Sequence, residues 1–238
     1  MLKNYLKIAW RNLKRQPGFT MLNVLGLAIG MAGFLFLVLY IRDELSYDKF
    51  NTKADRIYRV ALERSYPERS RKYAIIPAGY ADAIKAEYPG VEGTCRLFFF
   101  GPANMLLRKE GQTYREDNIV WSDSTFFEFF DLPLLQGNSA TALTAPNSVV
   151  LTEEMALKYF GPNWPKTNII GSSLEQVQGE DNFTITGVCA NVPSNSHLAF
   201  DFLVSSTSMN FLAGDPDYLS FSAMTYLLLD EKTKADQL

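Results

Sequence analysis

The feature that most constrains the fold of this chain is an uncharged stretch of 23 residues near its N-terminus. From Phe19 to Ile41 the sequence reads FTMLNVLGLAIGMAGFLFLVLYI. A helix of this length is about 34 Å long, and the hydrocarbon core of a bilayer is about 30 Å thick. The apolar part of a cleaved signal peptide is shorter and ends at a small-x-small site, which is not the pattern here. We therefore predict an uncleaved transmembrane helix.

The charges on either side of this stretch predict how the helix crosses the membrane. Residues 1–42 carry six basic side chains and no acidic one, whereas residues 43–238 carry 17 basic and 26 acidic side chains. Basic flanks stay on the cytoplasmic side of a bacterial inner membrane. We expect residues 1–18 to be a cytoplasmic interfacial helix, 19–41 to span the bilayer and 42–238 to be a periplasmic domain. The acidic body argues against nucleic-acid binding.

Residues 1–16 have the pattern of an amphipathic helix that lies on the inner membrane surface. Apolar residues recur at three- and four-residue spacing, basic residues occupy the other side, and Pro17-Gly18 breaks the helix. Positive-inside charge alone would also account for the basic residues, so that reading stays open. The residues expected to contact the membrane surface or an ATPase are Lys3, Lys7, Trp10, Arg11, Lys14 and Arg15.

Small residues inside the spanning stretch indicate where a second helix could pack. Gly26 and Gly30 form a G-x-x-x-G pair, and Gly33 follows at the next turn. Small side chains at this spacing let two helix backbones approach closely, and Asn23 could donate a hydrogen bond across the same contact. We predict a helix-packing face made of these four residues.

The remaining sequence predicts one mixed domain of the α+β class. Strands and helices are interleaved without a regular β-α-β rhythm, which disfavours a doubly wound sheet. Capping and stop residues predict a helix that begins at Pro77, a short aromatic helix capped by Asp123, and a helix capped by Thr152. Residues 205–218 are expected to be helical or irregular. The expected strands cover residues 56–63, 91–100, 105–108, 112–121, 148–151, 173–177, 183–192 and 222–229. We expect a hairpin at Lys109-Glu110-Gly111 and pairing of 173–177 with 183–192.

The sequence contains no recognisable catalytic motif. It lacks G-x-x-x-x-G-K-[ST], G-x-S-x-G and H-E-x-x-H. The single histidine, His197, rules out a multi-histidine metal site and is predicted to be a hydrogen-bonded turn residue. Cys95 and Cys189 are expected to be buried free thiols, although a disulfide is chemically permitted in an exported domain. We expect no catalytic residue, no cofactor and no metal, and hence no enzyme.

Several segments resemble the MacB/FtsX-like permease subunits of ABC transporters, in that family's order. They are LKNYLKIAWRNLKRQPGFTMLNVLGLAIGMA at residues 2–32, SYDKF and DRIYRV within 46–60, FFEFFDLPLLQGN at 126–138, NSVVLTEEMALKYFG at 147–161 and ITGVCANVPSNSHLAFDFLVS at 185–205. The resemblance implies a first transmembrane helix followed by a periplasmic core domain. It also implies a separate cytoplasmic ATPase, a homo- or heterodimer of permeases in the bilayer, and a periplasmic or outer-membrane partner.

The resemblance further implies that this chain is a fragment, because full-length members continue into three more membrane helices. Two alternatives remain open at this point. One is a single-span, membrane-anchored periplasmic binding or sensor domain. The other is a membrane-anchored hydrolase, which ranks last because no nucleophile–base pair is evident.

Overall fold

The computed structural model describes residues 2–99, 105–177, 179, 182–209 and 218–237. The chain divides into two compact units, Met1–Tyr47 and Asp48–Leu238. Each unit has its own architecture, a pair of helices in the first and a sheet with short helices in the second.

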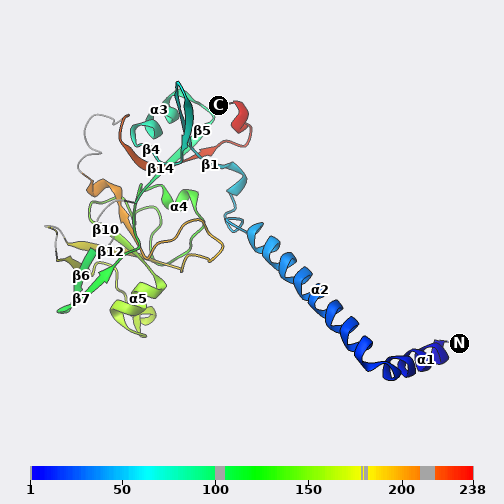
Figure 1. Ribbon diagram of the computed structural model, residues 1–238. Coiled ribbons are helices and arrows are strands. Elements are labelled where there is room, and N and C mark those ends of the chain that lie inside the picture. The colour runs from blue at the N-terminus through cyan, green and yellow to red at the C-terminus, as the bar shows by residue number, and fades with distance from the viewer. Residues whose placement is uncertain (1, 100–104, 178, 180–181, 210–217, 238) are drawn as a thin grey trace. The chain divides into compact units, whose positions relative to one another are not determined.

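The first unit consists of two helices, α1 (Leu2–Arg15) and α2 (Pro17–Glu44). Gln16 leaves the helical conformation, and Pro17 occupies the first turn of α2, where its missing amide costs no hydrogen bond. The Thr20 hydroxyl donates to the carbonyl oxygens of Leu13 (3.0 Å) and Gln16 (2.9 Å), which ties the two helices at the bend seen in Figure 1. By length and composition α2 can cross a membrane, with a mean hydropathy of 2.5 over its most apolar window.

The second unit is built on one mixed sheet of twelve strands. Their order is β1-β14-β5-β8-β13-β10-β12-β11-β6-β7, with β4 beside β14 and β9 beside β12. The pairs β8–β13 and β10–β12 are parallel, and the other pairs are antiparallel. The strands are β1 (Ile57–Arg59), β4 (Ile76–Pro77), β5 (Val91–Phe98), β6 (Met105–Lys109), β7 (Gln112–Glu116), β8 (Ile119–Ser122), β9 (Leu134–Gly137), β10 (Ser148–Thr152), β11 (Ser173–Gln176), β12 (Phe183–Cys189), β13 (Phe202–Ser205) and β14 (Phe221–Leu229).

A separate two-stranded ribbon pairs β2 (Leu62–Tyr66) with β3 (Arg69–Tyr73). The helices of this unit are α3 (Gly79–Glu87), α4 (Phe126–Phe129) and α5 (Glu153–Phe160), and Figure 1 shows α3 beside β5 and β4. Among the described residues, short 3-10 turns cover Ala54–Arg56, Trp164–Lys166, Ser206–Ser208 and Ala235–Gln237. Helices and strands mixed in one domain confirm the predicted α+β class.

The central strand β10 is buried on both faces and separates two apolar clusters. Val150 belongs to a cluster with the aromatic side chains of α4, whereas Val149 and Leu151 belong to a cluster with α5. Alternate side chains of a strand point to opposite faces, so one continuous apolar run serves both clusters. Burial of both clusters is therefore what holds α4 and α5 on opposite sides of the sheet.

Several local predictions are confirmed. The strands near residues 91, 148 and 222 are present, and β11 pairs antiparallel with β12. The β6–β7 hairpin turns at Glu110 and Gly111, which both have positive φ angles, as a two-residue hairpin turn requires. The Thr152 side chain accepts a hydrogen bond from the Met155 amide (3.4 Å) at the start of α5.

Three predicted strands have the wrong extent. The strand expected over 56–63 is two strands, because the chain leaves β1 after Arg59 and enters the β2–β3 ribbon at Leu62. The strand expected over 112–121 is also two, because β7 pairs with β6 whereas β8 pairs with β5 and β13. The strand expected over 183–192 ends at Cys189.

Two predicted helix starts are wrong. Pro77 lies in β4, and α3 begins at Gly79. Asp123 does not cap α4, because its carboxylate accepts from the backbone amide of Arg96 (2.9 Å) and from the Arg96 guanidinium Nε (2.8 Å). The partly buried guanidinium is a stronger donor than the free amides of a four-residue helix. The segment 205–218 contains the end of β13 and one 3-10 turn, and residues 210–217, with Asp215 and Asp217, lie outside the described part of the chain.

Both cysteines are free and buried, which agrees with the thiol prediction. Burial raises the pKa of Cys189 to about 12 and raises the pKa of Cys95 as well. Because the thiolate is the reactive form, we expect neither thiol to react with Ellman's reagent at pH 8 in the folded protein. After unfolding in guanidinium without reductant, both should react. Reaction before unfolding would contradict the burial, and no reaction afterwards would indicate a disulfide.

Candidate functional site

The predicted helix-packing residues lie on one face of α2. Asn23, Gly26, Gly30 and Gly33 follow each other at three- and four-residue spacing along the helix, and all four are exposed in the single chain. A Cβ atom added at any of the three glycines would meet no other atom within 4 Å. The face therefore has room for a closely approaching helix, and its pairing remains a prediction.

The predicted surface contacts lie on α1, a helix with a basic and an apolar side. At helical spacing Lys3, Lys7, Arg11 and Lys14 share one side, with Arg15 at its edge, and the helix contains no acidic residue. Trp10 is exposed at the border of this side, where the Lys14 ammonium lies 5.4 Å from the centre of the Trp10 ring. Such a helix can lie on an anionic surface, and its partner likewise remains a prediction.

The second unit begins with a segment that is fixed to the domain at several points, residues 48–56, here called the strap. Its first residue, Asp48, has a positive φ of 58°. The Asp48 amide donates to the Asn195 carbonyl oxygen (2.9 Å), and its carboxylate accepts from the His197 amide (3.1 Å). The His197 ring places Nδ1 2.8 Å from the same carboxylate. The loop around His197 therefore holds both the backbone and the side chain of Asp48.

His197 connects this carboxylate to the strand β14. Its Nε2 lies 2.7 Å from the Tyr226 hydroxyl oxygen. Burial raises the pKa of Tyr226 to about 12, so the hydroxyl stays protonated at neutral pH. It can therefore donate to Nε2 while Nδ1 donates to Asp48. The prediction that His197 is a hydrogen-bonded turn residue is confirmed, and the bonds join three distant segments.

The middle of the strap is bonded to the segment that follows α4. Asn51 is buried, and its side-chain oxygen accepts from the Asp131 amide (3.0 Å). The Asp131 carboxylate accepts in return from the Thr52 amide. The Lys53 ammonium donates to the Glu128 carbonyl oxygen (2.6 Å) near the end of α4, where a cation also interacts favourably with the helix dipole.

The end of the strap is bonded to two paired strands where the end of β14 lies beside the start of β5. The Arg56 guanidinium donates to the Leu229 carbonyl oxygen (2.8 Å) at the end of β14. It also forms an ion pair with Glu92 in β5. The strap is thus tied along its whole length to the His197 loop, α4 and the β5–β14 pair. None of these contacts joins neighbours in sequence.

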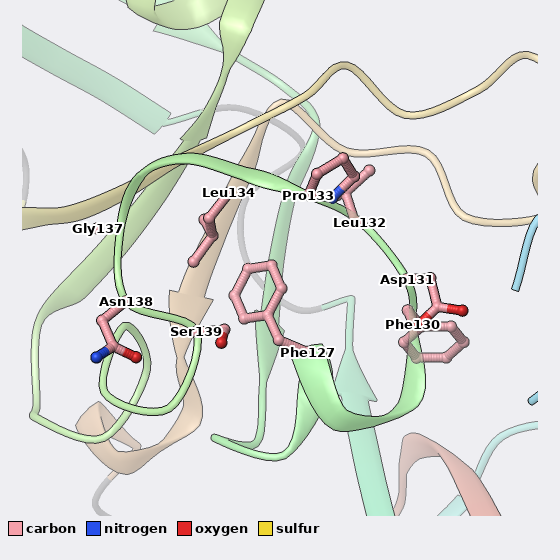
Figure 2. A pocket seen from close by; sticks show the side chains of 9 residues that line it. All are labelled: Phe127, Phe130, Asp131, Leu132, Pro133, Leu134, Gly137, Asn138 and Ser139. Atoms are coloured by element: carbon pink, nitrogen blue, oxygen red, sulfur yellow. The ribbon is translucent and has the colours of Figure 1, made fainter. Parts of the chain in front are cut away.

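A hollow of about 610 Å³ lies beside α4, and Asp131, one of these anchors, is part of its wall. Figure 2 shows the chain from Asp131 to Ser139 arching around the Phe127 ring, with the Leu134 side chain directed at the ring. Two polar groups on its wall are engaged in hydrogen bonds: Asp131 accepts from the strap, and the Asn138 oxygen accepts from the Ala140 amide (2.9 Å). Its volume suits a small molecule, but no convergent set of free polar groups would orient one.

Two further charged clusters have structural explanations. Glu116 is 3% exposed, and its carboxylate accepts from the Lys158 ammonium (2.7 and 2.8 Å) and the Tyr159 hydroxyl (2.7 Å). The Arg96–Asp123 pair joins β5 to the start of the α4 turn. Within the described residues no group of three histidine, cysteine, aspartate or glutamate side chains could hold a metal ion.

Sequence reasoning did not find the strap. Asp48, Asn51 and Asp131 were not among the predicted site residues, although Asp48 and Asp131 lie in the SYDKF and FFEFFDLPLLQGN segments. Four strap residues bond to partners that are 75 or more residues away in the sequence: Asp48, Asn51, Thr52 and Lys53. No local sequence pattern therefore predicts these contacts. The signal that was available is that three of the family-like segments contain the bonded residues.

The family model for the MacB-like periplasmic core domain matches residues 20–238. The chain belongs to this family. A solved domain of a putative permease from Porphyromonas gingivalis shares the fold, with a TM-score of 0.68, 22% identity, and coverage of 79% of this chain and 78% of that one. The periplasmic region of MacB from Actinobacillus actinomycetemcomitans is also similar, with a TM-score of 0.55, 12% identity, and coverage of 83% and 81%. Comparison with curated proteins gives no match.

The MacB-like domain confirms the resemblance seen in the sequence. At these identities the solved structures establish the shared fold, and the family model establishes membership. The chain is a component of the ABC-transporter type of permease, a class that is generally non-catalytic. One apolar helix followed by a MacB-like domain is the arrangement of a membrane-anchored protein with an extracytoplasmic domain.

The Asp48–His197 contact predicts an energetic coupling in the MacB-like domain. We expect a double-mutant cycle of Asp48→Ala and His197→Ala to give a coupling energy of about 1 kcal/mol, because the charged hydrogen bond is only partly exposed. Urea unfolding of the detergent-solubilised chain, followed by tryptophan fluorescence, would measure it. The same cycle with Asp55→Ala is the control, since this strap carboxylate is exposed. A coupling energy equal to that of the control would contradict the contact.

Proposed function

We propose that this chain is a permease subunit that couples ATP hydrolysis by a separate cytoplasmic ATPase to a conformational change in the periplasm. The output would be export or mechanotransmission. The family match already shows that the chain contains a MacB-like periplasmic core domain. The coupling is the proposal, and the strap is the observation that carries it.

The strap supports coupling because its bonds allow little movement of residue 48 relative to the sheet. Asp48 is held by four hydrogen-bonding groups of the 195–197 loop, Thr52 by Asp131, and Arg56 by β14 and β5. A flexible linker would absorb a displacement of the preceding helix, since a coil adjusts its end-to-end distance at little cost. The strap is hydrogen-bonded to the domain at its beginning, middle and end. A displacement at residue 48 is therefore passed to α4 and β14.

The partners follow from the same proposal. The membrane segment would sit in the bacterial inner membrane with a cytoplasmic N-terminus. Residues 1–18 would lie at the membrane surface next to the ATPase, 19–41 would span the bilayer, and 42–238 would be periplasmic. The open glycine face of α2 would contact a second permease, identical or not. A periplasmic or outer-membrane partner would receive the output.

A single-span binding or sensor domain is the second candidate, and the hollow beside Phe127 is the observation that favours it. A small ligand in that hollow would contact Phe127 and Leu134. The Asp131 carboxylate and the Asn138 oxygen on its wall are already bonded to the protein, so the coupling proposal has the stronger support. The proposed function requires no catalytic residue, cofactor or metal in this chain.

Photocrosslinking from α1 tests the coupling proposal and the orientation together. A photoreactive amino acid replaces Lys7 on the basic side, and in a matched control it replaces Ala9 on the apolar side. In cells we expect a crosslink from position 7 to a protein that carries nucleotide-binding motifs, identified by mass spectrometry, and lipid adducts alone from position 9. Crosslinks from position 7 to periplasmic proteins, or to lipid only, would contradict the proposal.

A further inference from the structure

The β2–β3 ribbon is the most basic part of the second unit. Residues 62–73 carry four basic and two acidic side chains, whereas the rest of residues 48–238 carries 13 basic and 22 acidic ones. Among the described residues neither strand of the ribbon pairs with the twelve-stranded sheet. A two-stranded ribbon is only marginally stable alone in water, so a contact that covers one of its faces would stabilise it.

The register of the ribbon gathers its arginines on one face. Arg64 lies directly opposite Arg71, and Tyr66 lies opposite Arg69. Residues that are directly opposite in an antiparallel pair, and those two positions along, share a face. We call Arg64, Tyr66, Arg69 and Arg71 the arginine face. All four side chains are exposed, and the face carries no acidic residue.

The other face of the ribbon is neutral and internally bonded. Glu63 lies opposite Lys72 and forms an ion pair with it at 4.0 Å. The Ser70 hydroxyl donates to the same carboxylate. The two faces therefore differ in charge although they belong to the same twelve residues. Positive charge is therefore concentrated on the arginine face, which is the side that can bind an anion.

Aromatic rings hold two of the arginines in place. The Arg64 guanidinium lies 5.2 Å from the centre of the Phe221 ring, and the Arg69 guanidinium lies 5.8 Å from that of Tyr66. Stacking on a ring leaves the N–H groups at the guanidinium edge free to bind a carboxylate with two parallel hydrogen bonds. In the described part of the chain none of the three arginines forms an ion pair.

The Arg64–Arg71 pair is unfavourable as it stands, because like charges directly opposite each other destabilise a ribbon. An anion between them would convert the repulsion into two attractions. We propose that the arginine face is a docking surface for an acidic segment of a partner protein, whose carboxylates the three arginines bind. Tyrosine and arginine are the side chains most enriched at the centres of protein interfaces.

A protein fits this surface better than a membrane does. The turn at the end of the ribbon is Tyr66-Pro67-Glu68-Arg69, which offers a carboxylate and no large aliphatic side chain for insertion between lipids. The inference rests on the proposed function only for where the partner acts, as the periplasmic recipient. The binding chemistry itself uses only the ribbon and the Phe221 ring beside it, so its test needs neither ATP nor transport.

Two neighbouring residues on opposite faces supply a matched test. The full chain, in nanodiscs of phosphatidylcholine, is titrated with fluorescently labelled poly-L-glutamate, and fluorescence anisotropy gives the affinity. We expect Arg71→Gln to weaken binding about three- to tenfold, and Lys72→Gln, which removes the same charge from the other face, to weaken it less than about twofold. Binding of poly-L-glutamate to the basic helix α1 is the same in all variants, so it reduces each observed loss without changing which variant loses more.

Arg64→Gln is the second variant, used if thermal unfolding shows that Arg71→Gln perturbs the fold, and the same loss is expected from it. Equal losses for the two faces, or no loss from either arginine, would overturn the proposal. The lipid alternative is tested by co-sedimentation with phosphatidylglycerol vesicles. If Arg71→Gln weakens vesicle binding more than it weakens poly-L-glutamate binding, the surface binds lipid headgroups and the proposal is wrong. A result here leaves the coupling function untouched, because photocrosslinking at position 7 tests that separately.

Discussion

The hydrogen-bonded Asp48 carboxylate is the constraint on which the rest of the account depends. It stands at the first residue of the second unit, about one-third exposed, and such a charge is stable only if donors replace the water that it loses. His197 supplies two of these donors, its backbone amide and Nδ1. Because Tyr226 holds the other ring nitrogen, the imidazole cannot turn away without breaking a second bond. The start of the domain is thereby fixed, through His197, to Tyr226 within β14.

The sheet makes these anchors rigid. β14 pairs with β5 over six registered positions and with β1, so Tyr226 and Leu229 sit on a strand that is bonded along both edges. α4, which receives Lys53 and is followed by Asp131, is packed through its phenylalanines into the cluster that also contains Val150 of β10. Closely packed protein interiors have low compressibility, so they transmit a displacement instead of absorbing it. The strap therefore ends on elements whose side chains pack into the same apolar cluster.

The sequence was informative where structure is local and uninformative where it depends on distant contacts. The length of the apolar stretch, the Glu110-Gly111 turn and the Thr152 cap each depend on a few adjacent residues, and these predictions agree with the structure. Asp123 has the residue type and the position of a helix cap, but its carboxylate accepts a hydrogen bond from Arg96, 27 residues away. The break between β7 and β8 follows from a change of partner strand, which alternation of side chains does not report. For the same reason the bonds between the strap and His197 or Asp131 could not be predicted, although the family-like segments that contain these residues were recognised.

Hydrogen exchange of the strap amides measures whether the strap is fixed to the domain. In the full chain in a bilayer, the Asp48 and Thr52 amides donate to Asn195 and Asp131, whereas the Lys49 amide between them has no acceptor in the described part of the chain. If the strap is fixed to the domain, the first two amides should exchange as slowly as those of β14, and the Lys49 amide should exchange fast. Exchange of all three at the rate of an unstructured peptide would show a flexible linker and would contradict coupling through this segment.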